Sequence, residues 1–549
     1  MLDTEDVDAE IKKMVVNANV VDGVNAKTLQ VVTTYPDNSL NTQNLTKMYK
    51  VTGSNEDGTM TQKAITDALA TKADASTAAT KAYVDSAVAS IPSSGSTINM
   101  NSEDAGHLVT IDSNGNLVAS TLTDEVLINA LVNSNSYNGS GTIGLDIDYA
   151  NRTFVRVQDA IGKTMGSDFN MYTMYGGRTR CNVADDGTIN AFYGDNDYTE
   201  DGSNGQVMVY QPKFYYKRVI QTAEQLNRGQ IIRHEVLILS DTEKTGFKLA
   251  PIFGDNLEYV LLPAYDASIA NDKLASIAGV KPANYMTAAQ AETYALARGT
   301  GWHIMNLAAE SANQMLEMIE FGTMNGQSAL GDGITYAAQN ANNCRYLTGS
   351  TASLGNTSGQ ATETQVDING TISTMSTGGY RAISYRGMEN PWGNLWSMVG
   401  GVNITGDGAS GGGIPYICTN YDYTPGTNGS NYESLGFNIP GSYGWINAMG
   451  YGNDKYDWVY MPIECSSSAN SLLPVGDTVW PSYNLNGINT LVIGGSYGFK
   501  EECGPFQYGA DRPLNDTSRV NYGAKLLYIP QKNEIYTANI AKWTTHMGG

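Results

Sequence analysis

The chain has 549 residues, which is long enough for several domains. Its 55 acidic and 33 basic residues give a formal net charge of −22, and a field of that sign disfavours nucleic acid and anionic membranes as partners. Charged residues make up only 16% of the chain, whereas glycine (59) and tyrosine (34) are abundant, so strands and loops are favoured over long helices. No run approaches the ~20 apolar residues of a membrane span, and no signal-peptide pattern stands at the N-terminus. We expect a protein that is made in a cytoplasm and does not insert into a membrane.

Residues 1–60 are polar and weakly patterned. A brief helix is expected through Ile11 and Val15, followed by a turn at 20–24. A segment of this kind buries little apolar surface by itself. We therefore interpret residues 1–60 as a docking segment that attaches the chain to another protein.

Residues 61–92 predict a short helical stalk because they are rich in alanine, the best helix former. Ile65 and Leu69 lie on one helical face, and Val84 and Val88 lie on another after an interruption. This spacing is typical of a coiled-coil seam. A single solvated helix is the alternative, but a helix this polar is marginal alone. Association with copies of the same chain is favoured.

Residues 97–145 predict a small β unit followed by a linker. Alternating runs at 107–111 and 116–118 flank the Asn114-Gly115 pair, which is a strong hairpin signal.

Residues 146–250 predict a β-rich spacer domain. Aromatic and β-branched side chains dominate several short runs, as is typical of strands. These runs lie at 207–210, 213–217 and 231–239.

Residues 251–549 predict one large domain that begins with a strand at 259–262 and two helices. The first helix spans 287–298 and opens with a capping box between Thr287 and Gln290. The second spans 306–321 and carries an apolar stripe that belongs in a core. Short apolar runs separated by Tyr/Asn/Gly/Ser loops follow, with an insertion at 349–378.

The stretch RGMENPWGNLWSMVGGVNI at 386–404 is the densest apolar turn of the chain. Asn390 and Gly393 mark a turn, and the aromatic rings around it must lie against a core because such rings bury large areas. The Gly400-Gly401 pair is expected to let the chain change direction. We name residues 390–396 the tryptophan turn.

The tryptophan turn also carries a resemblance to a known fold. Residues 393–396 resemble the G-N-[VL]-W signature of the C-type-lectin-like fold of formylglycine-generating enzymes and phage variable tail proteins. Residues 493–497 resemble the "GGSW/Y" strand of that fold, and 504–506 with 521–527 resemble its "GPF…GARL" closing strand. The resemblance implies an α+β, mainly β chain with a short N-terminal coiled-coil stalk, a β-rich spacer and a C-terminal C-type-lectin-like domain. Phage tail proteins of this kind are usually trimers.

Enzymatic activity is not expected. The formylglycine-generating activity implied by the resemblance uses a cysteine pair near the closing strand, but 521–527 contains none and the nearest is Cys503. Gly494–Gly498 matches the G-x-S-x-G nucleophile motif, yet the helix that must follow Ser496 is missing from the pattern. The acid pairs Asp454/Asp457 and Glu501/Glu502 leave a glycosidase open, although solvated acids are the default.

No cofactor or metal site is expected. The five cysteines stand far apart without a C-x-x-C pair, so we interpret them as small core residues. The family often binds calcium around the tryptophan turn. Asn390 matches that pattern, but Ser397 stands where the family has a glutamate, so calcium remains only an open alternative.

A receptor-binding surface is expected on the C-terminal loops, where Tyr and Trp interleave with Asn, Ser and Gly as they do in antibody loops. The set runs Tyr443, Trp445, Tyr451, Tyr456, Trp458, Trp480, Tyr483, Tyr497, Phe506 and Tyr508. The diversified positions of phage variable proteins, which diversity-generating retroelements alter, carry over to Ser482, Tyr483, Asn484, Asn486, Tyr497, Lys500, Gln507, Tyr508, Asp511 and Arg512. Trp392, Trp396 and Phe506 would be scaffold. The alternative is that these loops are solvated connections.

The resemblance therefore implies a bacteriophage tail fibre or receptor-binding protein in the virion. It would be a homotrimer, would dock to other tail or baseplate proteins, and would bind a bacterial surface receptor, either glycan or protein. Two alternatives stay open: a virion-associated polysaccharide depolymerase, and a structural tail or baseplate component that binds no receptor.

Overall fold

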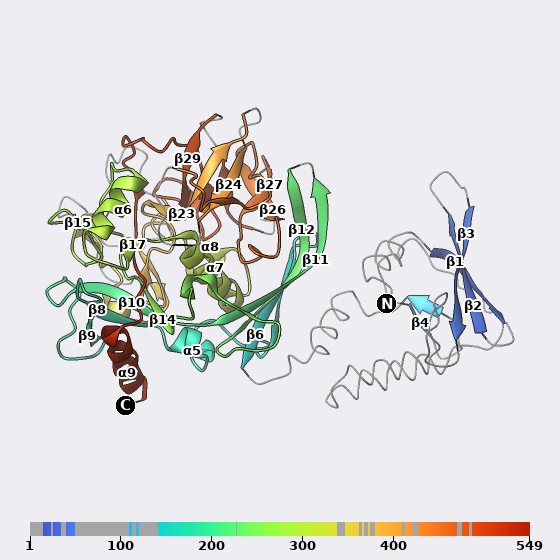
Figure 1. Ribbon diagram of the computed structural model, residues 1–549, viewed down its shortest axis with the longest axis horizontal. Coiled ribbons are helices and arrows are strands. Elements are labelled where there is room, and N and C mark those ends of the chain that lie inside the picture. Colours follow the sequence, from blue (N-terminus) through green and yellow to red (C-terminus); the bar gives the residue numbers. More distant parts are fainter. Residues whose placement is uncertain are drawn as a thin grey trace. The chain divides into compact units, whose positions relative to one another are not determined.

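The structure is a computed structural model of residues 1–549 (Figure 1). It describes residues 141–226, 228–336, 346–361, 379–408, 412–418, 420, 427–468, 475–481 and 486–548, together with the backbone of strands at 15–22, 26–34, 40–49, 109–111, 117–119, 365–366 and 372–373. The chain divides into two compact units, Met1–Ser140 and Gly141–Gly549. The predicted coiled-coil stalk at 61–92 lies outside the described residues.

The N-terminal unit contains an antiparallel sheet in the order β1 (Val15–Asp22), β2 (Ala26–Thr34), β3 (Leu40–Tyr49). The expectation that a helix passes through Val15 is wrong, because Val15 begins β1. Four of the eight residues of β1 are valines, and a β-branched side chain fits a pleated strand better than a helix. Farther along, β4 (Val109–Ile111) pairs antiparallel with β5 (Leu117–Ala119), which confirms the hairpin predicted around Asn114-Gly115.

The C-terminal unit is mainly β, as expected, and is built on two sheets. The smaller one has the order β17 (Trp302–Ile304), β32 (Leu526–Tyr528), β14 (Tyr259–Pro263), β10 (Gln206–Pro212), β8 (Thr179–Val183) and β9 (Ile189–Phe192). The larger one has the order β13 (Lys248–Leu249), β11 (Tyr215–Leu226), β12 (Gly229–Ser240), β26 (Gly444–Tyr451), β28 (Thr478–Trp480), β30 (Tyr508–Gly509), β29 (Ile488–Ile493), β23 (Trp396–Gly406), β24 (Gly413–Ile417) and β25 (Glu433–Ser434).

Shorter strands complete these sheets. β6 (Thr142–Asp148) and β7 (Thr153–Gln158) join the larger sheet through β12, β27 (Pro462–Ser466) joins through β26, and β31 (Tyr522–Gly523) joins through β23. Separate small sheets are β15 (Ser268–Ala270) with β16 (Lys273–Ala275), β18 (Gly359–Gln360) with β21 (Ile383–Tyr385) and β22 (Met388–Glu389), and β19 (Gln365–Val366) with β20 (Ile372–Ser373).

The predicted boundary near residue 250 is wrong, because residues 146–250 and 251–549 fold as one unit. β10 from the supposed spacer pairs with β14, and β12 pairs with β26. All seven residues of β10 are buried, so this strand needs neighbours on both edges and cover on both faces. Part of that cover comes from beyond residue 250, which explains why 146–250 does not form a separate body.

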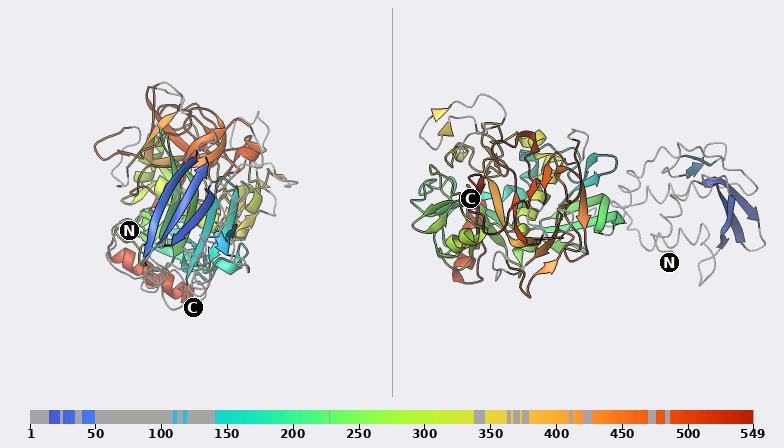
Figure 2. Two further views of the ribbon diagram at one scale, coloured as in Figure 1. Left: turned by 90° about the vertical axis from the view of Figure 1, so that its right-hand side faces the viewer. Right: turned by 90° about the horizontal axis from the view of Figure 1, so that it is seen from above.

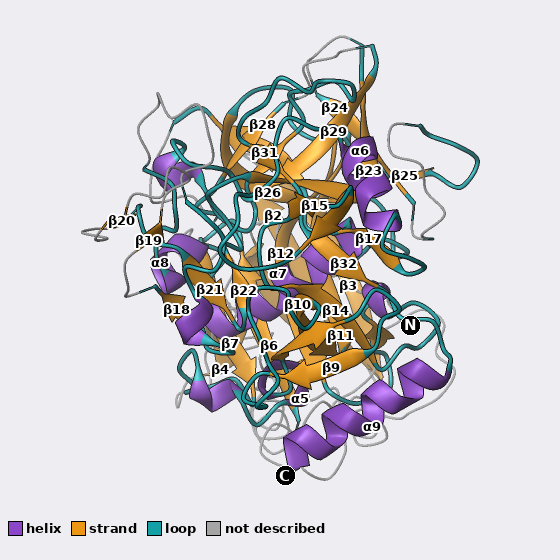
Figure 3. Ribbon diagram, turned by 90° about the vertical axis from the view of Figure 1, so that its left-hand side faces the viewer, coloured by secondary structure: helices purple, strands orange, loops and turns teal. Residues whose placement is uncertain are grey.

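Both predicted helices are confirmed. α6 (Ala288–Leu296) begins with the capping box between Thr287 and Gln290. α7 (Leu307–Phe321) is capped by the Asn306 side chain and ends at Gly322, whose φ of 71° is left-handed. α7 contacts β6 and β23 and runs through the middle of the unit (Figure 3), which explains why it is buried on nearly every face.

The other helices are shorter or peripheral: α5 (Thr173–Gly176), α8 (Gly326–Leu330), α9 (Glu534–Gly548), and the 3-10 turns η3 (Ser167–Phe169), η4 (Pro251–Phe253), η5 (Ala352–Leu354) and η6 (Lys500–Glu502). α9 lies at the periphery of the unit, beside β9 (Figures 1 and 2). Trp543 anchors α9 by donating its indole N–H to the Gly177 carbonyl at 3.0 Å. Within the described residues, no helix is both long and apolar enough to cross a membrane.

The stretch after the tryptophan turn behaves differently from the expectation. β23 runs from Trp396 to Gly406 straight through Gly400-Gly401, so the glycine pair does not turn the chain. Its pairing with β29 is irregular between Met398 and Asn403. The glycine pair therefore accommodates a local irregularity in a continuous strand, a usual place for glycine in a sheet.

A buried ion pair joins α7 to the segment before the tryptophan turn. Arg386 donates from Nε to Glu320 Oε2 and from Nη2 to Glu320 Oε1, both at 2.6 Å. The same guanidinium donates to the carbonyls of Gly166 and Tyr175. Tyr385 donates its hydroxyl to Glu320 at 2.9 Å. Three distant stretches of chain are thus held by one charged pair that solvent does not reach.

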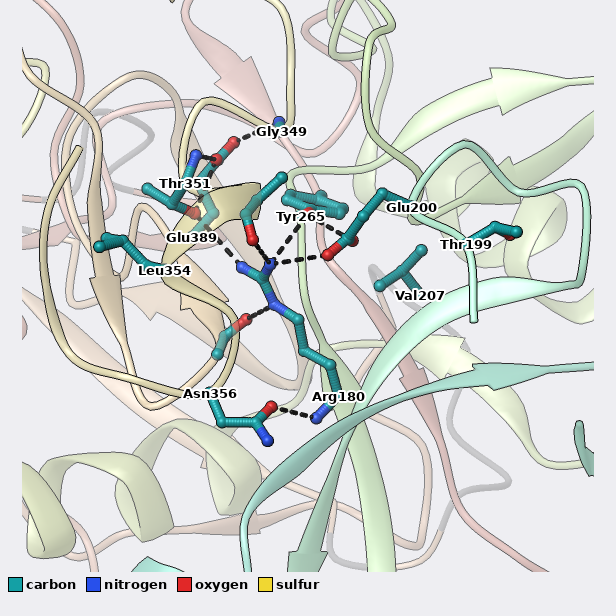
Figure 4. Close-up of polar contacts among 12 residues, drawn as sticks. Arg180, Thr199, Glu200, Val207, Tyr265, Gly349, Thr351, Leu354, Asn356 and Glu389 are labelled. Carbon is teal, nitrogen blue, oxygen red and sulfur yellow. Dashed lines mark hydrogen bonds and ion pairs between the residues drawn. The ribbon is translucent and has the colours of Figure 1, made fainter. Parts of the chain in front are cut away.

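A second buried network holds residues 346–356 against β8 (Figure 4). Arg180 donates to Glu200 Oε1 at 3.1 Å, to the Tyr265 hydroxyl at 3.1 Å, to Thr351 Oγ1 at 3.3 Å and to the Gly387 carbonyl at 2.9 Å. All three guanidinium nitrogens therefore have partners. This network holds the insertion against β8.

Burial favours the uncharged form of three carboxyl groups: Glu389 and Asp477, which are buried, and Glu310, which is half-buried. Burial raises the pKa of Glu310 to about 7, that of Glu389 to about 7 and that of Asp477 to about 8. Glu389 accepts hydrogen bonds from Gly349 N and Thr351 N, and Asp477 accepts one from Phe506 N at 2.7 Å. These backbone donors only partly offset the cost of burying a charge.

Replacing Arg386 with Met should lower the free energy of unfolding by about 3–5 kcal/mol, because Glu320 is left buried without its cation. The measurement is urea unfolding followed by far-UV circular dichroism. Arg152→Met, at an exposed position, is the control and should change stability by less than about 0.5 kcal/mol. If both variants unfold at the wild-type midpoint, the pair does not hold the unit together.

The protein should be less stable at pH 8 than at pH 5. A carboxyl group whose pKa is raised by folding contributes fully below its unfolded pKa and loses that contribution as pH rises through the folded value, here about 7 to 8. Each of the three groups should contribute about 1–3 kcal/mol to the loss. Asp477→Asn imitates the uncharged form, so its denaturation midpoint should fall less between pH 5 and pH 8. An unchanged pH dependence in Asp477→Asn would contradict this assignment.

Candidate functional site

A row of aromatic rings reaches the surface where β26, β28 and the turn after β29 meet. Tyr443 and Trp480 have ring centroids 4.6 Å apart, and Trp480 and Phe499 are 5.7 Å apart. Phe499 in turn packs edge-on at 5.4 Å against Trp396, which is buried. The row therefore rises from the core to the solvent, where 37% of Tyr443 is exposed. We name Tyr336, Tyr443, Trp480, Phe499, Lys500, Glu501 and Glu502 the aromatic patch.

Strand register places the two outer rings. Gly444 on β26 pairs with Val479 on β28, so Tyr443 and Trp480 lie opposite each other at the end of this short antiparallel ladder. Directly opposed aromatic pairs on one sheet face stabilise each other. β28 lies at the end of the unit that is opposite α9 (Figure 3). The rings are thus held by a sheet, which limits the side-chain entropy they would lose on binding a ligand.

Glycines shape the turn that carries Phe499. Gly494, Gly495 and Gly498 all have positive φ, between 73° and 91°. A Cβ on Gly495 would meet Gln507 Oε1 at 1.9 Å and Cys503 Sγ at 2.5 Å, so only glycine fits there. A Cβ on Gly494 would lie 3.3 Å from the Pro391 carbonyl oxygen and 3.4 Å from Trp392 Cα, so this turn packs closely against the tryptophan turn.

Ser496, inside the same turn, is fully buried. Its hydroxyl accepts a hydrogen bond from Asn521 Nδ2 at 3.2 Å, and only the 3-10 turn η6 follows. A nucleophile elbow requires an exposed serine at the start of a helix. The G-x-S-x-G match is therefore a packing feature of the turn.

Charged groups border the rings. Tyr336 donates its hydroxyl to Glu501 Oε2 at 3.3 Å, and the Lys500 ammonium lies 5.9 Å from the Tyr336 ring centroid. Thr478 donates to Glu502 Oε2 at 3.3 Å. Burial raises the pKa of Glu502, whereas hydrogen bonds from Tyr443 and Thr478 lower it. The patch therefore offers flat apolar faces beside carboxylate acceptors and one ammonium donor.

The predicted receptor-binding residues do not form one surface. Asn486 and Lys500 are exposed, and Asp511 and Arg512 are half-buried. Ser482, Tyr483 and Asn484 lie outside the described residues.

Three predicted contact residues are in the interior, which corrects the expectation that they face a receptor. Tyr497 is 8% exposed, Tyr508 is 1% exposed and Gln507 is completely buried. Tyr508 donates its hydroxyl to the Tyr460 carbonyl at 2.5 Å, and Gln507 Nε2 donates to Thr478 Oγ1 at 2.9 Å. Tyr508 is buried because it lies in β30, which pairs with β28 and β29 in the larger sheet, and Gln507 directly precedes that strand. Tyr497 lies in the turn after β29 and packs in a buried cluster with Ile334 and Leu395.

Most of the aromatic residues assigned to the surface are likewise core. Trp445, Tyr456, Trp458 and Phe506 are buried, and only Tyr443, Tyr451 and Trp480 of the described members present substantial surface. Sequence reasoning missed Tyr336, Phe499, Glu501 and Glu502 as neighbours. The last three directly flank Lys500, but nothing in the sequence shows that Tyr336 folds onto them.

The tryptophan turn does not fit a calcium ion. Ser397, which stands where the resembled fold has a glutamate, is buried. The Lys525 ammonium already pairs with Asp266 at 3.3 Å and donates to the Asn390 carbonyl. In the part of the chain that the structure describes, no three His, Cys, Asp or Glu side chains gather in a way that could hold a metal.

Other residues considered for chemistry have structural partners. Asp457 accepts a hydrogen bond from the Tyr216 hydroxyl at 2.6 Å and forms an ion pair with Lys248 at 2.7 Å. Asp454 accepts a hydrogen bond from the Tyr451 hydroxyl, so both acids have structural partners. Cys181 and Cys503 are buried free thiols, Cys465 is a half-buried one, and Cys418 is buried with its Sγ donating to the Asn420 carbonyl at 3.2 Å. Cys344 lies outside the described residues.

A comparison with protein-family models and a search among curated proteins each returned no match. No relative therefore lends this chain a function.

Proposed function

We propose that the protein binds carbohydrate through the aromatic patch and is the receptor-binding protein of a bacteriophage tail. The observation that carries the binding proposal is the row Tyr443–Trp480–Phe499, exposed at one end and held by a sheet. Soluble proteins expose contiguous apolar patches chiefly where they bind a partner. Tyrosine and tryptophan also supply the largest share of energy at binding surfaces.

A glycan matches the chemistry of the patch better than a flat protein surface does. The C–H faces of a pyranose ring pack against aromatic rings, and its hydroxyls donate to carboxylates such as Glu501 and Glu502. The Lys500 ammonium adds a donor for ring or hydroxyl oxygens, or for the acidic groups of many bacterial polysaccharides. Because the net charge of the chain is −22, a strongly anionic polysaccharide should bind more weakly than a neutral one, except where its acidic groups contact Lys500.

The remaining architecture is proposed on the resemblance of the sequence. The C-terminal unit would be a C-type-lectin-like tip, residues 61–92 a trimeric stalk and residues 1–60 the attachment to other tail or baseplate proteins in the virion. Three tips on one stalk would raise the avidity for a repeating polysaccharide, because each further contact is made at high effective concentration. Weak single-site binding therefore suffices for adsorption.

A non-enzymatic role is part of the proposal. Glu501 and Glu502 are the carboxyl pair closest to the rings, and a depolymerase would use such a pair on a bound sugar. Glu502 accepts from Thr478 and Tyr443, and Glu501 accepts from Tyr336. Both carboxylates thus already accept hydrogen bonds from hydroxyl groups, which is the kind of donor that a bound sugar offers.

The test is binding of the full-length chain to an array of purified bacterial surface polysaccharides, followed by Kd measurement on the best binder. Tyr443→Ala should weaken binding about tenfold or more, because it removes the exposed stacking face. Tyr285→Ala is the matched control, since Tyr285 is also an exposed tyrosine but lies outside the patch, and it should bind like the wild type. Glu501→Gln should weaken binding severalfold, since the carboxylate is the stronger acceptor.

Wild-type Kd values in both Tyr443→Ala and Glu501→Gln would overturn the site. Release of new reducing ends during the assay would instead establish the depolymerase alternative. Absence of any polysaccharide binding, with binding to a purified envelope protein, would overturn the glycan assignment.

A further inference from the structure

A lysine, an aspartate and two asparagines meet in the interior beneath the tryptophan turn. Lys525, Asp266, Asn390 and Asn394 are each at most 4% exposed. The Lys525 ammonium lies 3.3 Å from Asp266 Oδ1. Asn394 Nδ2 donates to the other carboxylate oxygen, Asp266 Oδ2, at 2.8 Å, and Asn390 Nδ2 lies 3.4 Å from the same oxygen. One carboxylate therefore bridges an amine and two primary amides.

The backbone fixes all of these side chains. Asp266 and Lys525 face each other in an antiparallel β-bridge, supported by the hydrogen bond from Ala267 N to the Ala524 carbonyl at 2.9 Å. Asn390 N donates to the Ile383 carbonyl and Asn394 N to the Ile334 carbonyl, each at 2.8 Å. The amine and the amides are thus held together by the fold and do not depend on flexible loops.

Among the described residues, the carbonyl oxygens of both amides, Asn390 Oδ1 and Asn394 Oδ1, are buried and lack a hydrogen-bond partner. A buried carbonyl left unpaired costs free energy, and a structural amide network would normally satisfy it. Orphaned acceptors beside a buried amine suggest that the amide has another use.

We propose that Lys525 and Asn394 form an intramolecular isopeptide bond, assisted by Asp266. Asn394 is the acyl group in this reaction because Asp266 holds its amide more tightly than that of Asn390. The reaction needs no cofactor, no oxidant and no other protein.

The atoms balance as follows. The Lys525 ammonium gives one proton to Asp266, and the neutral Nζ attacks Cγ of Asn394 to form a new C–N bond. The Asp266 carboxylic acid passes its proton to the departing Nδ2, so that the Cγ–Nδ2 bond breaks and ammonia leaves. The second proton of the attacking nitrogen goes to that ammonia, and the products are one secondary amide and one ammonium ion. Asp266 is a catalytic residue in this scheme because it contacts both reacting groups.

A small cavity adjoins the reacting amine. Lys525, Glu310, Gln314 and Ser397 line it, and its volume is about 20 Å³, enough for one water-sized molecule. Ammonia is of that size, so the cavity gives the leaving group a place next to Lys525. Gln314 Oε1 and Ser397 Oγ are buried without partners in the described structure and can accept its hydrogens.

The isopeptide bond would link the closing-strand segment at 521–527 covalently to the tryptophan turn. Lys525 precedes β32, and Asn390 of the same turn lies 135 residues before it in the chain. A covalent link across so long a loop restricts the unfolded chain in the way a disulfide does. Thiols do not cleave an amide bond, so this link, unlike a disulfide, would be independent of redox conditions.

The test is mass spectrometry of the purified full-length chain. We expect the wild-type mass to be about 17 Da below that of the sequence, the mass of one ammonia lost in a covalent modification. Proteolysis should then give a branched peptide that joins Lys525 to Asn394. An asparagine that cyclises to a succinimide loses the same mass, but it leaves no branched peptide.

Two variants and a control separate the possibilities. Lys525→Arg and Asp266→Asn should each retain the full sequence mass and give no branched peptide. Lys532→Arg, an exposed lysine close by in sequence, should still lose about 17 Da. A wild-type chain with its full mass and only linear peptides overturns the proposal, whether or not the variants fold. A branch at Asn390 overturns the choice of Asn394.

Discussion

The buried pair of Glu320 and Arg386 is the constraint on which the C-terminal unit depends. Two charges that are shielded from water are stable only when they pair with each other. The bidentate hydrogen bonds at 2.6 Å form only when α7 and the segment before the tryptophan turn lie in the observed relative position. The same guanidinium fixes the carbonyls of Gly166 and Tyr175. An interaction this costly to break specifies one arrangement of distant parts of the chain.

From that fixed arrangement the aromatic patch follows. The tryptophan turn presents Trp396 as the buried end of a row of rings, and the glycine turn after β29 brings Phe499 onto it. β26 and β28 then supply the outer rings. Each ring packs against another ring or against a sheet, so the patch extends from the core to the solvent-exposed surface. A rigid, partly apolar surface loses little entropy when it binds.

Tyrosine abundance had two possible meanings, and the structure separates them. In an antibody-like loop the ring faces solvent, but a tyrosine can also fill a core if its hydroxyl finds an acceptor. Tyr175 donates to the Leu316 carbonyl, Tyr216 to Asp457 and Tyr508 to the Tyr460 carbonyl. These three tyrosines are buried, and their hydroxyl groups form hydrogen bonds that connect separate segments of the core. Composition alone does not distinguish the two uses, because the partner of each hydroxyl comes from a remote part of the chain.

The sequence by itself determined the local elements: the hairpin at 109–119, α6 with its capping box, α7 with its two caps, and the strands around 207–262. These depend on residues a few positions apart, whose propensities and side-chain hydrogen bonds are local. Only the tertiary structure decided that residues 146–250 share sheets with the rest, that Tyr508 is buried and that Tyr336 lies beside Lys500. Strand order and burial are set by pairing between segments hundreds of residues apart, and no local pattern encodes which segments meet.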